Sequence, residues 1–247
     1  ASRRPHAGAV DPAQAVAAPS RARRPQRAAA ASKRLPQEIL NARSPMLAFR
    51  IRLQPKVIAV YGMINQAVRK LVVDGHGAET WSTICEEAGL TETDFSSLQK
   101  YPDDVTYRLV GAASKVLETP PDVILEAFGE FWTAYAKETS FSRLLQFGGR
   151  TFPEFVQNLD QMHAKIKLSL PELEPPMFRA TELSAGGFRL HYYSSRPGLA
   201  PLVKGMMKGV ADIYGMTIDI RLDKSRAHGH DHDEFVITYA AAPGQAA

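Results

Sequence analysis

His163 lies on the apolar face of a predicted helix, among residues that are otherwise all hydrophobic. In residues 151–170, TFPEFVQNLDQMHAKIKLSL, His163 and the apolar residues recur at steps of three and four. This period is typical of one face of an amphipathic helix. The residues on this face are Phe152, Phe155, Val156, Leu159, His163, Ile166 and Leu170. A histidine on such a face is either hydrogen-bonded in the core or available as a metal ligand.

A second group of side chains could bind carboxylates. Tyr192, Ser194 and Arg196 form a Y-x-S-x-R pattern in a segment predicted to be a strand, so alternation puts them on one face. Two hydroxyls and a forked guanidinium suit carboxylates, which arginine binds in a bidentate way. A buried-face histidine together with a carboxylate clamp fits haem, which has an iron to ligate and two propionates to hold.

The remaining pattern indicates the elements that position these residues. Apolar periods predict helices over 61–77, 78–90, 105–117, 121–138 and 140–149, with Gly75 or Gly77 ending the first. After the 151–170 helix, strands are predicted over 178–184, 187–195, 216–222 and 234–240, and a helix over 198–215. We therefore predict an α+β fold, in which a helical amino-terminal lobe precedes a lobe with a four-stranded antiparallel sheet and a packed helix.

The amino-terminal residues differ in composition from the rest. Residues 1–59 hold 12 Lys/Arg against two acids, a net of +10, whereas residues 60–247 hold 18 against 24, a net of −6. No aromatic residue is interleaved with the arginines before Phe49, so we expect no nucleic-acid binding.

The same residues, 1–59, are rich in Ala, Arg and Pro, which is typical of disorder. A transit peptide and translated sequence upstream of a native start at Val60 are two further interpretations, and the second is favoured. We predict a leader over 1–59 that is disordered or not native, one folded domain over 60–240 and a disordered tail over 241–247.

Cys85 is the single cysteine of the 247 residues. It excludes an internal disulfide and any multi-cysteine zinc or iron–sulfur site, and its place on an apolar helix face is that of a small buried hydrophobe. No apolar run reaches the roughly 20 residues of a membrane helix. The sequence therefore predicts a cytoplasmic protein without membrane insertion.

Five segments resemble a known family. They are YGMIN from Tyr61, NLDQMH ending at His163, PPMF at 175–178, YYSSRPGL at 192–199 and DHDEF at 231–235. With these, residues 60 to about 240 resemble a haem nitric oxide/oxygen binding (H-NOX) domain of the stand-alone bacterial type. The family includes the haem domain of soluble guanylate cyclase, and its haem lies between the two lobes.

The resemblance implies a role for each candidate residue. His163 would be the proximal ligand of the iron in haem b (iron protoporphyrin IX), with its other ring nitrogen held by a hydrogen-bond acceptor. Tyr192, Ser194 and Arg196 would hold the haem propionates. Pro176 would press on the porphyrin face and help to distort the ring.

The residues of the distal side determine which gas binds. Oxygen-binding family members donate a hydrogen bond to O2 from a distal tyrosine, and counting back three residues from Gly205 puts Leu202 at that position. Leu202 cannot donate, and Ile64, Val68 and Met206 add apolar wall, so we expect nitric oxide to be preferred over O2, with CO as a further ligand. Trp132 also aligns with a distal position, and its indole N–H is a donor. An oxygen or redox sensor is therefore the alternative.

The resemblance also implies how a signal would pass. In the family, nitric oxide weakens the iron–histidine bond and the proximal helix shifts, which here would move the 151–170 helix. Only AAAPGQAA follows Tyr239. We therefore expect a sensor without enzyme activity that signals to a separate protein, which family precedent gives as a histidine kinase or a cyclic-di-GMP enzyme.

The sequence allows three other interpretations. The loop with His228, His230 and His232 beside Asp231 and Asp233 could bind zinc or nickel, but a polar hairpin turn is favoured. An enzyme is disfavoured because the sequence has no nucleophile elbow and no Gly-rich phosphate loop. A haemless interaction scaffold would suit a chain without the histidine and arginine described above, and both are present.

Overall fold

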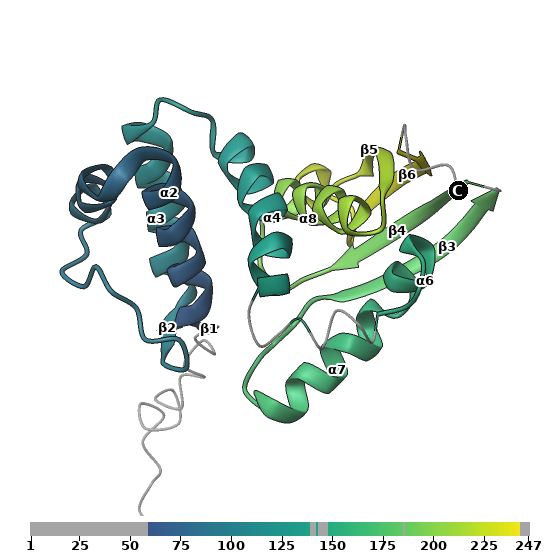
Figure 1. Ribbon diagram of the computed structural model, residues 1–247, viewed down its shortest axis with the longest axis horizontal. Coiled ribbons are helices and arrows are strands. Elements are labelled where there is room, and N and C mark those ends of the chain that lie inside the picture. Colours follow the sequence, from purple (N-terminus) through teal and green to yellow (C-terminus); the bar gives the residue numbers. More distant parts are fainter. Residues whose placement is uncertain (1–58, 139–141, 143–147, 185, 243–247) are drawn as a thin grey trace, which may run out of the picture. The chain divides into compact units, whose positions relative to one another are not determined.

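Helices precede an antiparallel sheet along the chain, as expected (Figure 1). The computed structural model describes residues 59–138, 142, 148–184 and 186–242. These residues form two buried apolar clusters, one in the helices before residue 136 and one between the later helices and the sheet. The predicted α+β class is confirmed. The predicted leader up to Ile58, most of the helix predicted over 140–149, and residues 243–247 of the predicted tail lie outside the described residues.

The amino-terminal part consists of three long helices and a small two-stranded sheet. In order these are β1 (Ala59–Tyr61), α2 (Gly62–Glu87), β2 (Lys100–Pro102), α3 (Asp103–Val116) and α4 (Pro121–Glu138). Strand β2 lies between the helices predicted over 78–90 and 105–117, where no strand was predicted, and it pairs antiparallel with β1. Its central residue, Tyr101, is buried with its ring edge against Phe95 at a centroid distance of 5.0 Å. Three residues are too few to show a strand period, so only the packing reveals this strand.

The first long helix contains a break at a glycine. Helix α2 runs from Gly62 to Glu87, but Gly77 has φ 87° and ψ 166°, which is not helical. Glycine adopts this region without the steric penalty of other residues. The predicted division into two helices near Gly77 is therefore confirmed. Cys85, beyond the break, is buried as predicted, and Trp81 is buried beside it in the same cluster.

The helix predicted over 151–170 is two helices. Thr151 caps α6 (Phe152–Gln157), and its hydroxyl accepts a hydrogen bond from the Glu154 amide at 3.3 Å. Asn158 then leaves helical geometry, with φ −93° and ψ 2°, and α7 (Leu159–Ser169) follows. The Asn158 side chain donates to the Gly148 carbonyl at 2.9 Å. The prediction of a single helix was wrong, because the backbone leaves helical geometry at Asn158, where the side chain bonds to a carbonyl ten residues earlier in the chain.

The later part contains the predicted four-stranded antiparallel sheet. Its strands are β3 (Met177–Ser184), β4 (Gly187–Tyr193), β5 (Met216–Lys224) and β6 (Asp233–Ala241), in the order β3-β4-β6-β5. Strands β4 and β6 are central, and alternate residues on one face of each, such as Leu190 and Ile237, are fully buried. The short 3-10 helix η2 (Arg226–His228) lies between β5 and β6.

Helix α8 (Ala200–Ile213) packs closely against α4, and Figure 1 shows the two side by side. A Cβ atom on Gly205 would lie 1.9 Å from the Glu126 carbonyl oxygen, and one on Gly129 would lie 2.3 Å from the Leu202 carbonyl oxygen. Only glycine allows this approach. The glycines therefore fix where Leu202, on α8, stands relative to α4.

Candidate functional site

Nine of the ten predicted site residues line one cavity, and the tenth, Val68, is instead buried in the amino-terminal apolar cluster. The cavity has a volume of about 300 Å³, within the range of small-molecule sites. Its walls come from α2, α3, α4, α6, α7, α8 and the segments at the start of β3 and the end of β4. The nine residues are Ile64, Trp132, His163, Pro176, Tyr192, Ser194, Arg196, Leu202 and Met206. The structure thus brings together residues that lie up to 142 positions apart in the sequence (from 64 to 206).

His163 lies on α7 and is held by a backbone carbonyl. Its Nδ1 lies 3.2 Å from the carbonyl oxygen of Pro176. A carbonyl oxygen can only accept, so Nδ1 carries the proton and donates, and Nε2 is left with a lone pair in the neutral ring. Burial lowers the pKa of His163, and the carbonyl of Pro176 raises it by a smaller amount. Because burial dominates, the ring is neutral at neutral pH. A neutral imidazole with one ring nitrogen fixed is the form that binds a metal ion.

The polar end of the cavity is a turn and not a strand. Strand β4 ends at Tyr193, so the argument from strand alternation was wrong for Ser194 and Arg196. Ser194 instead accepts a hydrogen bond from the Arg196 amide at 3.1 Å, which folds the chain back and brings both side chains to the cavity. Tyr192 is buried, and burial raises the pKa of its phenol. The hydroxyl is therefore a neutral donor.

Arg196 already binds a carboxylate in this structure. Its Nε lies 2.7 Å and one terminal nitrogen 3.2 Å from the two carboxylate oxygens of Asp103, and another terminal nitrogen donates to the Glu174 carbonyl at 2.9 Å. Both charged side chains are only 15% exposed. The sequence reading missed Asp103, because an acid in the first turn of a helix is ordinarily explained by the helix dipole. The forked contact shows that this guanidinium is placed for bidentate carboxylate binding.

Tyr107 is a second cavity residue that the sequence reading missed. It lies on α3, lines the cavity and donates from its hydroxyl to the Pro197 carbonyl at 2.8 Å. Asp103 and Tyr107, one turn apart on α3, therefore both bind the turn that follows β4. The sequence around Tyr107 does not reveal this contact, because Pro197 lies 90 residues later in the chain.

The cavity also has an apolar wall. Ile64 from α2 and Leu202 and Met206 from α8 line it together with Trp132 from α4. The Trp132 ring packs against Phe128 at a centroid distance of 6.4 Å. Of the four wall residues, only Trp132 has a side-chain hydrogen-bond donor, its indole N–H.

The residues of the cavity fit haem. One neutral imidazole can ligate the iron, hydroxyls and a guanidinium can bind two propionates, and apolar walls can enclose the macrocycle. These groups belong to separate walls of a single cavity, as a disc with a polar edge requires. The donor set therefore fits the group that the sequence pattern suggested.

Comparison with known proteins gives the same family. A sequence model described as Haem-NO-binding matches residues 61–222. Soluble guanylate cyclase gcy-31 of Caenorhabditis elegans is 28% identical over 175 residues, which cover 68% of this chain and 25% of that protein. Soluble guanylate cyclase gcy-35 of the same organism is 32% identical over 191 residues, 72% of this chain and 27% of that protein. The chain thus spans about a quarter of the length of these relatives.

A solved structure shares the fold. The crystal structure of an H-NOX protein from S. oneidensis in the Fe(II)NO ligation state has a TM-score of 0.67 and 20% identity, covering 73% of this chain and 99% of that one. Among the residues described here, none of the helices has the length and apolar character needed to cross a membrane. H-NOX domains are haem-based gas-sensing domains. With the family match over most of its folded residues, this chain belongs to the haem nitric oxide/oxygen binding (H-NOX) family.

Proposed function

We propose that the chain is a haem-based sensor that binds nitric oxide, with His163 as the axial ligand of the iron. The observation that supports this most is the contact between His163 Nδ1 and the Pro176 carbonyl at 3.2 Å, which leaves Nε2 free of a proton beside an apolar cavity. Iron held there supplies the binding position for a diatomic gas. The protein residues would set the orientation of the haem, the polarity around the bound gas and the access of gas to the iron.

The haem in this proposal is haem b, held without covalent bonds. Thioether attachment of haem, as in c-type haem, requires cysteines, and the single cysteine, Cys85, is buried in the amino-terminal apolar cluster and does not line the cavity. Tyr192, Ser194 and Arg196 would hold the propionates. The Pro176 carbonyl orients His163, and its ring, which lines the cavity, would contact the macrocycle.

Selection of nitric oxide over O2 rests on the apolar wall. O2 bound to ferrous haem is polar and gains from a hydrogen-bond donor, whereas nitric oxide depends less on one. Leu202, Ile64 and Met206 offer no side-chain donor. We therefore expect binding of nitric oxide and CO without stable binding of O2.

Signal transfer in this proposal starts at α7. His163 joins α7 to Pro176 just before β3, and Asn158 separates α7 from α6. A change at His163 therefore acts first on α7, whose Leu159 and Met162 are buried in the same apolar cluster as Phe155 of α6. The receiver would be a separate protein, either a histidine kinase or a cyclic-di-GMP enzyme.

Haem reconstitution of matched variants tests the axial ligand. The full chain is incubated with ferrous haem, and the retained haem is measured after gel filtration for the wild type, His163→Ala and His228→Ala. His228 is an exposed histidine of the β5–β6 connection that does not line the cavity, so it is the control. We expect haem loss in His163→Ala alone and recovery with added imidazole. Equal haem and an unchanged spectrum in His163→Ala would contradict the assignment.

A second candidate function is an oxygen or redox sensor. The observation in its favour is that Trp132, with its indole donor, lines the cavity. If Trp132 donates to O2, the wild type will form a stable oxygen complex in air and Trp132→Phe will lose it. If the apolar wall dominates, neither protein will form one. A chain that takes up no haem under any condition would favour the scaffold interpretation.

A further inference from the structure

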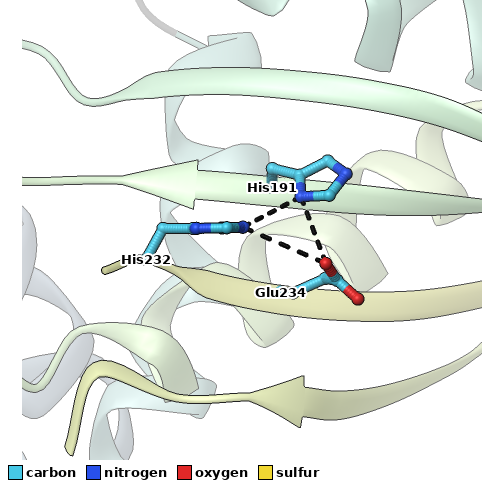
Figure 2. Close-up of side chains that lie close together, drawn as sticks. All are labelled: His191, His232 and Glu234. Atoms are coloured by element: carbon cyan, nitrogen blue, oxygen red, sulfur yellow. Dashed lines mark hydrogen bonds and ion pairs between the residues drawn. The ribbon is translucent and has the colours of Figure 1, made fainter. Parts of the chain in front are cut away.

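Three metal-binding side chains meet on the sheet, away from the cavity. They are His191 on β4 and His232 and Glu234 near the start of β6, and Figure 2 shows the three side chains pointing toward one another. His191 and Glu234 are direct partners in the β4–β6 register. His191 alternates with the buried Leu190 and Tyr192, so it lies on the other face of the sheet from the cavity.

The three possible ligand atoms are spaced as a small metal ion requires. His191 Nδ1 lies 2.9 Å from His232 Nε2 and 3.3 Å from Glu234 Oε2, and His232 Nε2 lies 4.0 Å from the same oxygen. Tetrahedral zinc, with bonds of about 2.0–2.1 Å to nitrogen and oxygen, needs ligand atoms about 3.3 Å apart. The three separations bracket that value. Shifts of well under 1 Å would bring all three atoms onto one ion.

The outer nitrogen of each histidine has a suitable partner. His232 Nδ1 lies 2.6 Å from the Asp231 carboxylate, and since a carboxylate accepts, Nδ1 carries the proton and Nε2 presents a lone pair to the cluster. His191 Nε2 lies 3.2 Å from the Thr181 hydroxyl, which can accept in the same way. Metal-bound histidines almost always donate their other N–H to such a group.

Two cations compete for the carboxylate. Glu234 is 2% exposed and bonds to Arg189 through Oε1 and to Lys224 through Oε2, the latter at 3.1 Å. Arg189 also binds Asp223 at 2.9 Å and contacts the oxygen that faces away from the histidines. The Lys224 side chain is 46% exposed, so its ammonium can move into solvent when an ion takes Oε2. The site can therefore admit a metal ion at the cost of the ion pair between Lys224 and Glu234.

We propose that His191, His232 and Glu234 form a zinc site with a fourth position open to water. Two imidazoles and one carboxylate are a common zinc ligand set, and a three-ligand set leaves one position for a small ligand. The ion would fasten the connection between β5 and β6 to β4, next to the turn that carries Ser194 and Arg196. The site shares no residue with the haem proposal and stands without it.

Zinc titration of the full chain by calorimetry, with any affinity tag removed, tests the site. We expect about one zinc per chain in the wild type. His191→Ala and His232→Ala should weaken binding at least about 100-fold. Asp231→Asn, on a side chain that is 84% exposed, should keep the fold and weaken binding about 10- to 100-fold through His232. Lys224→Gln should tighten binding, because it removes the competing cation.

His228→Ala and His230→Ala are the matched controls, since both histidines are exposed in the same connection and neither belongs to the cluster. Both should bind zinc within about twofold of the wild type. His163→Ala should also retain the zinc, which separates this site from the haem cavity. Zinc-edge X-ray absorption should show only nitrogen and oxygen ligands. Absence of binding at micromolar zinc, or equal losses in the controls and in His232→Ala, would overturn the proposal.

Discussion

His163 Nδ1 and the Pro176 carbonyl oxygen are 3.2 Å apart, and this contact sets the tautomer of the histidine. The acceptor is a backbone atom, so replacing the proline side chain keeps it. We predict that Pro176→Ala retains haem but removes the ring that presses on the macrocycle. Resonance Raman spectra should then show weaker out-of-plane haem modes at unchanged haem content. Unchanged modes, or loss of haem, would contradict the assigned contact.

The ion pair between Arg196 and Asp103 leads to a pair of opposite predictions. Arg196→Ala should speed haem dissociation about tenfold or more, since a charge-assisted hydrogen bond contributes about 1.5–3 kcal/mol. Asp103→Asn should slow it, because the substitution removes a carboxylate that competes with the propionates for the guanidinium. Transfer of haem to excess apomyoglobin measures both rates. If both variants lose haem faster, Asp103 orients Arg196 and does not compete.

A single donor at Leu202 should change the gas preference. Leu202→Tyr adds a hydroxyl to an apolar wall, and one hydrogen bond to a polar bound gas should raise the O2 affinity about 10- to 100-fold. Leu202→Phe adds the same ring without the hydroxyl and should leave the affinity unchanged. Oxygen titration of the ferrous proteins measures both. A rise in Leu202→Phe would show that cavity shape, and not hydrogen bonding, governs binding.

The close crossing of α4 and α8 makes Gly205 sensitive to a single methyl group. A Cβ there would lie 1.9 Å from the Glu126 carbonyl, so Gly205→Ala should cost about 1–3 kcal/mol in the free energy of unfolding. A Cβ on Gly111, in α3, would have no heavy atom within 4 Å beyond its chain neighbours and its own helix backbone, so Gly111→Ala should stabilise by about 0.5–1 kcal/mol. Urea unfolding of the two variants compares them directly. Equal effects would mean that the helix crossing relaxes freely.

Cys85 should be unreactive in the folded chain. Burial raises the pKa of its thiol to about 11, so roughly one thiol in a thousand is ionised at pH 8. Iodoacetamide labelling should therefore be slow without denaturant and fast in urea, where the pKa returns toward about 8.5. Mass spectrometry after timed quenching reads the rate. Rapid labelling of the folded chain would show that Cys85 is accessible.

Much of the fold could be predicted because its signals are local. Periods of three and four residues marked the helices, Gly77 marked the break in α2, and alternation marked the strands on either side of the Gly186 turn. The break at Asn158 could not be predicted, because it depends on a hydrogen bond to Gly148, which the 3.6-residue period does not reveal.

The sequence predicted which residues line the site better than it predicted the contacts that these residues make. Tyr192, Ser194 and Arg196 do meet at the cavity, yet a turn brings the last two there and not strand alternation. The partner of Arg196, Asp103, lies 93 residues earlier in the chain, so no local pattern could show the pair. Likewise, the predicted candidate metal ligands lay within 228–233, whereas the structure groups His232 with His191 and Glu234, which are partners in the β4–β6 register.

The visible spectrum of the ferrous protein under argon, in air and with nitric oxide tests the central claim most directly. We predict a haem spectrum that is unchanged in air and shifts with nitric oxide to a five-coordinate form, in which His163 no longer ligates the iron. A stable oxygen complex in air, or a spectrum that nitric oxide leaves unchanged, would contradict a nitric oxide sensor in which no side chain donates a hydrogen bond to the bound gas.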